Sequence, residues 1–591
     1  MFNRVRILWL EVKLVGGTSL GKTPLVVVFM LLATLLDLLG VALIAPFVSL
    51  LMAQNSAAVA LPLGLSKILG SQPLHALGIT LIVVFAVKAL ATFRLQGSIS
   101  RLTESIRAEL MTRLLHSYQH QPYRFHLNHS SAELSGRLIW YSQAFASGFV
   151  GSFMRLMADG FVFIALGVLI AMADPYALLF LVIVLAMVSI LVLRTIRKKS
   201  AEVTESNLRL TTEVVHSGNQ ALGGLREVRI LGCESYFLAR LQTAANGLVD
   251  SAAKIAVIQL IPRHSIEFAM IVFLVALVFF SQTGGDSGAK LIPLLGLIGA
   301  AAVRLMPAST SLLSSFNSLR SNRFAVAVLA RDLSIKDHTP IAGALTVAMT
   351  KPAHTRAPRF VSVAVQNLSF AYSASAAPVI ENLDFQINAG ETIGLIGPSG
   401  AGKSTLADLL LGFLAPTHGC VVVNGCDLKE ITREWQSMVA YIPQQSYLID
   451  DSLRRNVALG VADADIDDSA VVQALEDAQL GALLRQLPSG LDTQLGERGV
   501  RFSGGQRQRV SIARALYHDR EFLVLDEATS ALDVDTENEI VATIRALKGR
   551  KTILLIAHRE STLAVASRTI SLNLRPATST DSADPTPTLA Q

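Results

Sequence analysis

The sequence has few cysteines and few charged residues. Only Cys233, Cys420 and Cys426 occur in 591 residues, too few for a disulfide framework or a four-ligand zinc site, so we interpret them as thiols in a reducing compartment. Charged residues make up 16% of the chain and apolar residues 51%. A chain that is soluble or disordered throughout carries more charge than this. Part of the protein is therefore expected to lie in a membrane.

The chain also has no strong excess of one charge, because 51 Lys and Arg stand against 45 Asp and Glu, a net charge of +6. The basic residues are unevenly placed, with four in 1–23, six in 94–140 and nine in 194–254, but one each in 54–75 and 282–290. Membrane proteins concentrate Lys and Arg in their cytoplasmic loops. We therefore predict that both termini are cytoplasmic, and no nucleic-acid partner is expected.

Long apolar runs are absent after residue 360, but six occur before it. Each is long enough to cross a bilayer, which requires about 17–25 helical residues. They predict a membrane domain over residues 1–332 with α-helical spans at about 22–53, 76–95, 146–173, 175–194, 255–281 and 291–316.

The remaining segments divide by composition. Residues 333–358 contain three prolines and read as a linker. Residues 359–573 lack long apolar runs and are expected to form a separate α/β domain, on the motifs described next. The Ser/Thr/Pro-rich residues 574–591 are expected to be disordered. The outer loop 54–75 is either a short interfacial helix or a plain loop.

A phosphate-binding loop is predicted in the α/β domain. The strand GETIGLIG runs into GPSGAGKST and then into the apolar, periodic ADLLLGFL, which is the strand–loop–helix context of a P-loop. Backbone N–H groups surround phosphate at a helix N-terminus, the lysine neutralises the outer phosphates, and the serine hydroxyl can bind Mg²⁺. The expected nucleotide contacts are Gly397, Pro398, Ser399, Gly400, Ala401, Gly402, Lys403, Ser404 and Thr405.

The apolar strand FLVLDE at 522–527 ends in two acids, Asp526 and Glu527. Asp526 has the position of a carboxylate that binds the metal, which leaves Glu527 to polarise a water molecule against the terminal phosphate. A P-loop followed by this pair predicts an enzyme that hydrolyses ATP with Mg²⁺.

The segment FSGGQRQRVSIARAL at 502–516 resembles the signature of ATP-binding-cassette (ABC) proteins, and residues 360–570 are similar to their nucleotide-binding domain. The resemblance implies that Tyr372 in LSFAY stacks on adenine and that Gln444 in YIPQQ shares Mg²⁺ with Ser404 and Asp526. It also implies that SALD at 530–533 is the D-loop. Glu527, Gln444 and His558 in IAHR would be the catalytic residues.

By the same resemblance, the signature residues act on the nucleotide held by a second copy of the chain. These residues are Ser503, Gly504, Gly505 and Gln506. One cassette and six spans are half of the usual transporter. The resemblance therefore implies an exporter-type half-transporter that forms a homodimer in the bilayer.

Ionisable residues at membrane depth indicate where a substrate could bind, since each costs about 2.5–3.5 kcal/mol on insertion scales. Lys88, Arg263 and Arg304 lie on three different predicted helices and are expected to line one positively charged cavity, which suits phosphate or pyrophosphate. The spacing of four residues allows two pairs on single helix faces. The other such residues are Asp37, Arg155, Asp159 and Glu267, where Arg155 can pair with Asp159 and Arg263 with Glu267.

The segments VVFAVKALATF (83–93), IPRHSIE (261–267) and AAAVRLMPASTSLLSS (300–315) are similar to those of bacterial ABC flippases for polyprenyl-pyrophosphate-linked oligosaccharides. This resemblance implies that the three cations hold pyrophosphate and that the protein flips a lipid-linked glycan outward across the inner membrane. It also implies coupling helices near 120–136 and 228–240. Export of another lipid, a drug or a peptide is an alternative, as is a nucleotide-gated membrane regulator.

Overall fold

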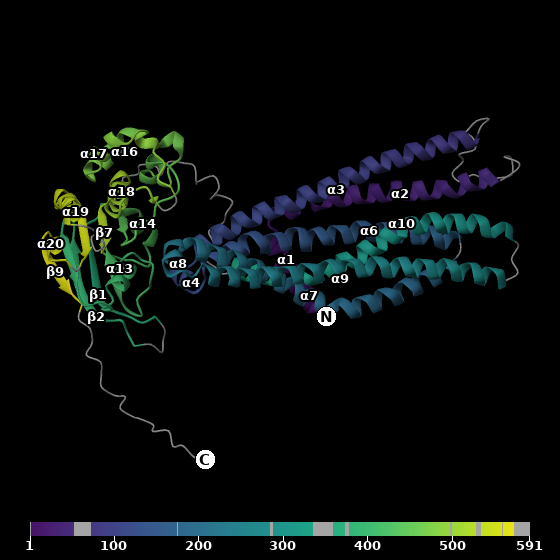
Figure 1. Ribbon diagram of the computed structural model, residues 1–591, viewed down its shortest axis with the longest axis horizontal. Helices are drawn as coiled ribbons and strands as arrows, with labels where there is room; N and C mark the ends of the chain where they lie inside the picture. The colour runs from purple at the N-terminus through teal and green to yellow at the C-terminus, as the bar shows by residue number, and fades with distance from the viewer. Residues whose placement is uncertain are drawn as a thin grey trace, which may run out of the picture. The chain divides into compact units, whose positions relative to one another are not determined.

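The computed structural model describes residues 2–52, 73–173, 175–283, 288–334, 359–372, 377–496, 499–527, 534–557 and 559–572. The chain forms two compact units. One contains Met1–Gln121 and His126–Thr339, and the other contains Pro122–Phe125 and Pro340–Gln591. The first unit is built from helices and the second holds both β-sheets (Figure 1). The expected linker and tail, and most of the loop 54–75, lie outside the described residues.

Six long helices carry the apolar stretches of the first unit: α2 (Thr23–Met52), α3 (Pro73–Gln119), α6 (Gly151–Ala173), α7 (Pro175–Gly223), α9 (Glu234–Thr283) and α10 (Gly288–Ser321). The shorter helices are α1 (Phe2–Gly16), the 3₁₀-helix η1 (Thr18–Lys22), α4 (Tyr123–Asn128), α5 (Ser131–Gly136), the π-helices η3 (Arg137–Tyr141) and η4 (Ala144–Val150), α8 (Leu225–Leu231) and α11 (Arg323–Ser334).

Within the described residues, five helical segments are long and apolar enough to cross a membrane: Thr23–Ile44, Leu74–Gln119, Ser131–Met172, Leu178–Ile196 and Glu234–Ala276. The sixth expected span lies in α10, where side chains are described from residue 304 onward. Helices α3, α7 and α9 have 47, 49 and 50 residues, so at a rise of about 1.5 Å per residue they are more than twice as long as a hydrocarbon core of about 30 Å is thick. They run side by side with the other long helices (Figure 1).

The long helices of the first unit pack both on neighbours in the chain and on helices far away in sequence. Helix α10 packs on α6 and α2, α2 packs on α3, and α7 packs on α9. A buried apolar cluster joins α6, α7, α9 and α10, with Leu166 and Phe273 fully buried. This packing brings polar side chains of α2, α3, α6 and α10 to one place, which is described below.

The second unit contains two sheets. Strands β2 (Ile380–Asn388), β1 (Ser362–Phe370), β4 (His418–Val423) and β5 (Cys426–Asp427) form an antiparallel sheet in that order. Strands β6 (Val439–Ile442), β7 (Phe522–Asp526), β8 (Thr552–Ile556), β3 (Thr392–Ile396) and β9 (Arg568–Ser571) form a parallel sheet in that order. Parallel strands place their carboxyl ends at one edge, where ligands of α/β sheets usually bind.

Helices pack around these sheets: α13 (Lys403–Leu410), α14 (Thr432–Met438), α15 (Leu453–Val457), α16 (Asp468–Asp477), α17 (Gly481–Gln486), α18 (Gly504–Tyr517), α19 (Val534–Leu547) and α20 (Glu560–Leu563). The 3₁₀-helices η5 (Asp463–Asp465) and η6 (Gly490–Asp492) complete the unit. One core lies around Trp435, Phe360 and Phe522, and a second joins the parallel sheet to α16, α18 and α19. Each face of the parallel sheet is therefore buried, as its continuous apolar strands require.

Candidate functional site

The predicted P-loop joins β3 to α13. Its Gly402 has φ of +89°, and a Cβ there would lie 2.9 Å from Val379 Cγ1, so only glycine fits without strain. The ammonium of Lys403 donates to the carbonyl oxygens of Gly397 (2.8 Å) and Pro398 (3.0 Å). The lysine is buried and lies inside the loop, where a cation would meet phosphate oxygens.

Tyr372 lies beside the end of the P-loop. Its hydroxyl is 3.0 Å from Thr405 Oγ1, and its ring meets Phe370 edge-on with the centroids 5.0 Å apart. The residue remains 42% exposed. An aromatic face held next to a phosphate loop is suited to stacking on a nucleotide base.

Asp526 ends β7 and is buried. The Tyr441 hydroxyl, at the end of the neighbouring strand β6, donates to Asp526 Oδ2 over 3.1 Å. Burial raises the pKa of Asp526 above its usual range, and the hydrogen bonds from Tyr441 and Ser404 oppose that rise. Burial, with the charge of Asp526, also raises the pKa of Asp408 on α13 to about 6.

Glu527 follows Asp526 at the same sheet edge. Its φ of +48° is unusual for a residue with a side chain, and the amide of Gln444 donates to Glu527 Oε2 over 2.9 Å. Gln444 also accepts, through its main-chain oxygen, a hydrogen bond from Gln508 of α18 (3.3 Å). Gln444 thus contacts two residues that are each more than 60 positions away in the sequence, at the carboxyl edge of the parallel sheet.

Side chains near the P-loop fit Mg²⁺ by their chemistry. The Ser404 hydroxyl hydrogen-bonds to Asp526, and the Gln444 amide lies at the adjacent acid. Hydroxyl, carboxylate and amide oxygens are the hard ligands that Mg²⁺ takes in proteins, usually together with water and phosphate oxygens. A divalent cation there would also offset the like charges of Asp526 and Glu527.

The signature segment opens helix α18. Ser503 is its N-cap: the Ser503 hydroxyl accepts from the Gln506 N–H (3.2 Å), and the Gln506 side chain accepts from the Ser503 N–H (2.9 Å). This capping box fixes a helix N-terminus with Gly504 and Gly505 in its first turn, a geometry that favours anions. The expected His558 and the D-loop 530–533 lie outside the described residues.

A charge cluster links three helices of the first unit. Asp37 of α2 forms ion pairs with Lys88 Nζ of α3 (2.5 Å, through Oδ1) and with Arg304 Nη2 of α10 (2.6 Å, through Oδ2). The Arg304 Nε lies 3.1 Å from the same Oδ2. The Asp37 side chain is only 3% exposed, whereas Lys88 is 17% and Arg304 29% exposed. Two of the three expected cations are therefore brought together by an acid.

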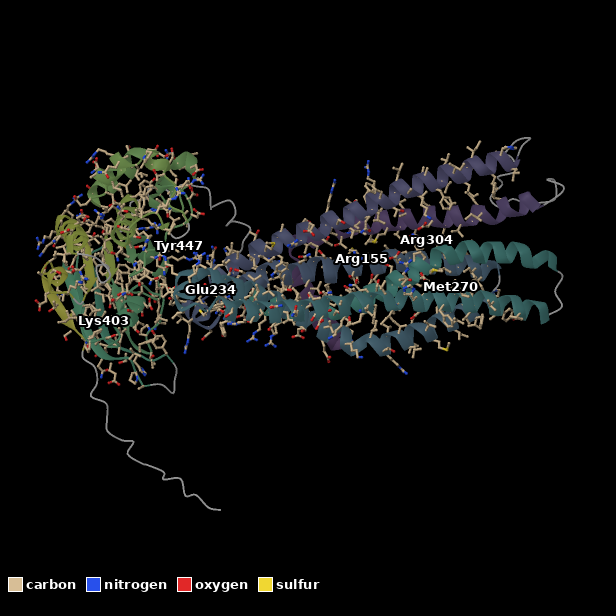
Figure 2. All side chains as sticks on the ribbon, viewed as in Figure 1. Arg155, Glu234, Met270, Arg304, Lys403 and Tyr447 are labelled. Carbon is tan, nitrogen blue, oxygen red and sulfur yellow. The ribbon has the colours of Figure 1, made fainter. Side chains whose placement is uncertain are left out.

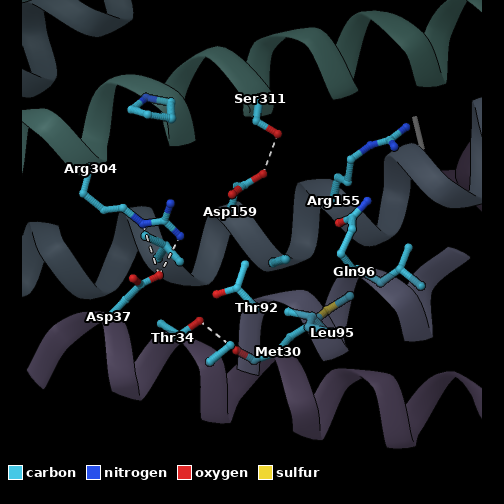
Figure 3. A pocket seen from close by; sticks show the side chains of 15 residues that line it. Met30, Thr34, Asp37, Thr92, Leu95, Gln96, Arg155, Asp159, Arg304 and Ser311 are labelled. Atoms are coloured by element: carbon cyan, nitrogen blue, oxygen red, sulfur yellow. Dashed lines mark hydrogen bonds and ion pairs between the residues drawn. The ribbon is translucent and has the colours of Figure 1, made fainter. Parts of the chain in front are cut away.

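Arg304 and Asp37 line a cavity of about 280 Å³ between α2, α3, α6 and α10 (Figure 3). Arg155 and Asp159 of α6 lie on the same cavity; Figure 2 marks Arg155 and Arg304 along the helical unit. Asp159 accepts from Ser311 (2.5 Å) and Arg155 donates to Ser152 (3.3 Å), in place of the Arg155–Asp159 pair that their spacing allows. The lining also contains four neutral polar residues, Thr34, Thr92, Gln96 and Ser311, and seven apolar residues.

The third expected cation lies apart from this cluster. Arg263 Nε pairs with Glu267 Oε1 on its own helix over 3.0 Å, as the spacing predicted, and its side chain is 63% exposed. Arg263 is not among the residues that line the cavity in the described part of the chain. Of the three cations predicted to share one cavity, Arg304 lines it in the described part of the chain, Lys88 reaches only its lining residue Asp37, and Arg263 pairs with Glu267 elsewhere.

Comparison with known proteins identifies both units. Residues 23–288 match the family described as ABC transporter transmembrane region, and residues 380–530 match the family described as ABC transporter. The ATP-dependent lipid A-core flippase of Alcanivorax borkumensis is 30% identical over 458 residues, which cover 76% of this chain and 75% of that protein. The chain belongs to the ABC transporters.

Other relatives agree with this assignment. The lipid A-core flippase of Cupriavidus pinatubonensis is 28% identical, with 80% of this chain and 78% of that protein covered. A solved structure of a bacterial Atm1-family ABC exporter with ATP bound has the same fold, with a TM-score of 0.76 at 23% identity, and covers 94% of this chain and 95% of that one. The protein is an exporter-type half-transporter that combines a multi-pass membrane domain with an ATP-binding domain. As in its family, ATP hydrolysis drives transport.

Sequence reasoning missed two features of this ABC exporter. The hydrogen bond from Tyr441 to Asp526 joins residues 85 positions apart, and the sequence offered only that Tyr441 lies three residues before Gln444. Asp37 was identified as an acid at membrane depth, but nothing in the sequence assigned it to both Lys88 and Arg304. The sequence also identified Arg155 as an ionisable residue at membrane depth, but it did not predict that Arg155 lines the cavity.

Proposed function

We propose that the protein is a homodimeric flippase that uses MgATP to move an anionic, phosphate-bearing lipid from the cytoplasmic to the outer leaflet. The observation that carries the proposal is a cavity lined by arginines of two helices, Arg155 and Arg304, with Lys88 bound to Asp37 of the same lining. Guanidinium groups bind phosphate through paired hydrogen bonds, and cations are placed at membrane depth only at a cost.

The charges of the cavity favour an anion. Arg155 and Arg304 balance Asp37 and Asp159 along the lining, and Lys88 adds one positive charge at Asp37. Among the described residues, the hydrogen bond of Arg155 goes to the neutral Ser152 hydroxyl, and the Asp159 carboxylate on the same helix interacts with Arg155 only through its charge. We assign Arg155, Arg304 and Lys88 to the headgroup, and we keep Arg263 as a weaker candidate from the sequence.

Two phosphate lipids suit this chemistry. The membrane segments resemble flippases of polyprenyl-pyrophosphate-linked oligosaccharides, whereas the relatives reported above are named lipid A-core flippases. Both groups of names describe flippases of a lipid. The substrate class that we propose is therefore a phosphorylated glycolipid, and the two kinds are separated by experiment.

The motif pattern of the sequence and the geometry of the described residues support the following chemistry at the ATP site. The P-loop residues Gly397 to Thr405 hold the phosphates, and Tyr372 stacks on adenine. Ser404, Asp526 and Gln444 would hold Mg²⁺, which would neutralise phosphate charge. Glu527 orients the attacking water with His558, and positioning of this kind supplies most of the catalysis in phosphoryl transfer.

A second copy completes each ATP site in this proposal. The chain carries one P-loop and one signature, and the capped N-terminus at Ser503–Gln506 is suited to contact the nucleotide of the partner. The distribution of Lys and Arg supports cytoplasmic termini. The bacterial relatives support the inner membrane as the location.

Flipping in proteoliposomes tests the proposal. Two fluorescent probes, a polyprenyl-pyrophosphate glycan and lipid A, are compared with the matching neutral polyprenol glycan. We expect ATP-dependent flipping of at least one phosphate lipid but not of the neutral one, and a loss of about tenfold or more in R155A and R304A, since a hydrogen bond to a charged group contributes about 1.5–3 kcal/mol. Equal flipping of the neutral probe, or none of any probe despite ATP hydrolysis, would contradict it.

A further inference from the structure

Asp37 is the most buried member of the charge cluster, and both of its carboxylate oxygens bind cations. Its partners Lys88 and Arg304 are each several times more exposed. In Figure 3 the carboxylate of Asp37 and the guanidinium of Arg304 meet at one end of the cavity. Asp37 and Arg304 both line the cavity, whereas Lys88 contacts Asp37 from outside the lining.

The arrangement solves a physical problem. A lysine and an arginine without a counter-ion at membrane depth would be strongly unfavourable, and one buried carboxylate stabilises both. A phosphate that enters the cavity would compete with Asp37 for the N–H groups of Arg304 and Lys88. Arg304 has two nitrogens directed at a single oxygen of Asp37, so a phosphate competes directly with that carboxylate oxygen.

We propose that Asp37 is an internal counter-anion that holds Lys88 and Arg304 until an anionic headgroup takes over their hydrogen bonds. This inference rests on the proposed function and adds a residue that sets how strongly the cavity binds negative charge. Asp37 lowers the affinity for anions, so that the site releases its substrate after transport.

The exchange would also loosen the helix bundle. Asp37 lies on α2, Lys88 on α3 and Arg304 on α10, so the cluster ties three helices together. When a phosphate replaces Asp37, the tie between α2 and the other two helices is lost. An anionic substrate thereby gains differential affinity for an arrangement in which α2 is free to move, which is the requirement for a ligand to shift a conformational equilibrium.

The test compares D37N with a matched control. E267Q likewise removes the carboxylate partner of an arginine in a membrane helix, but the Arg263–Glu267 pair is not on the cavity lining in the described residues. Binding of farnesyl pyrophosphate to each full-length variant in nanodiscs is measured without ATP. Farnesol serves as the neutral probe, and inorganic pyrophosphate as the free anion. The P-loop also binds phosphate, but it is the same in every variant, so only the difference between variants is interpreted.

We expect D37N to bind farnesyl pyrophosphate about tenfold more tightly than the wild type, the order expected for one charged hydrogen bond, and E267Q to stay within about twofold. Affinity for farnesol should not change. A gain for farnesyl pyrophosphate alone assigns the site to a lipid headgroup, and an equal gain for inorganic pyrophosphate assigns it to phosphate of either source. Both support the role of Asp37.

An unchanged or lower affinity in D37N, or an equal gain in E267Q, would overturn the counter-anion role. A wild type that binds farnesyl pyrophosphate no better than farnesol would instead contradict the proposed function, so the two failures are distinguishable. If D37N does not fold, the charge-balanced D37N/K88Q is compared with K88Q. The double variant should bind about tenfold more tightly, because Arg304 is then released from its competitor, and equal affinities would again overturn the proposal.

Discussion

The ATP site and the membrane cavity are built in different ways. At the ATP site, the functional side chains follow the carboxyl ends of β3, β6 and β7, which belong to one parallel sheet, and each motif is specified by its own stretch of sequence. In the cavity, Asp37, Lys88 and Arg304 come from three helices and are positioned by one another. A local motif can therefore be altered one residue at a time, whereas a charge cluster responds as a unit.

The largest expected effect is at the ATP site. Replacement of Glu527 by Gln should lower ATP hydrolysis about 100-fold or more, the range for loss of a general base, while nucleotide binding is retained. Phosphate release measures ATP hydrolysis, and a fluorescent ATP analogue measures nucleotide binding. E434Q alters an exposed glutamate of α14 and should hydrolyse ATP as the wild type does. Turnover in E527Q near the wild-type rate would remove Glu527 from the catalytic role.

A smaller effect is expected where a side chain only positions another. Y441F removes the hydrogen bond to Asp526 but keeps the ring, so the Mg²⁺ concentration for half-maximal hydrolysis should rise about tenfold, as expected for one hydrogen bond to a charged group. Mn²⁺ binding followed by electron paramagnetic resonance gives a readout independent of turnover. Y447F, at an exposed tyrosine farther along the same segment, is the control. An unchanged Mg²⁺ dependence in Y441F would show that Asp526 is oriented without this bond.

The stability of the ATP-binding unit should depend on Asp408. Its pKa of about 6 exceeds the value of about 4 in an unfolded chain, so between these pH values the folded state binds more protons and stability falls as pH rises. In D408N the asparagine does not titrate, so its stability does not fall in this way as pH rises. We expect its melting temperature to exceed that of the wild type above about pH 6, by about 2–4 °C for 1 kcal/mol, and the difference to shrink toward pH 4.

Thermal unfolding without nucleotide or Mg²⁺, measured at several pH values, checks this prediction. D450N alters an exposed aspartate of the same unit and should show no such pH-dependent difference. A constant difference between D408N and the wild type over the whole range would mean that Asp408 does not titrate there.

The smallest effect is expected at Arg263. Its side chain is 63% exposed and pairs within its own helix, and such pairs contribute about 0–1 kcal/mol. R263A should therefore reduce flipping less than about twofold, against tenfold or more for R304A. If R263A and R304A reduce flipping equally, the distinction between the cavity and the rest of the membrane helices fails.

The sequence predicted the ATP site better than the cavity for a physical reason. Lys403 and Asp526 are specified by residues adjacent in the chain, so the pattern around each one was enough to place it at a strand end. The ion pair between Arg304 and Asp37 spans 267 positions, and helix periodicity does not show which faces meet. Arg263 illustrates the limit, since its neighbour Glu267 was predicted but its distance from Arg304 was not.

The central claim is that the membrane cavity selects an anionic headgroup while the ATP site supplies the energy. The most direct measurement follows flipping of the phosphate lipid and ATP hydrolysis in the same proteoliposomes for the wild type, R304A and E527Q. The account predicts that R304A loses flipping but continues to hydrolyse ATP, and that E527Q loses both. Parallel loss of both activities in R304A, or retained flipping in R304A, would contradict it.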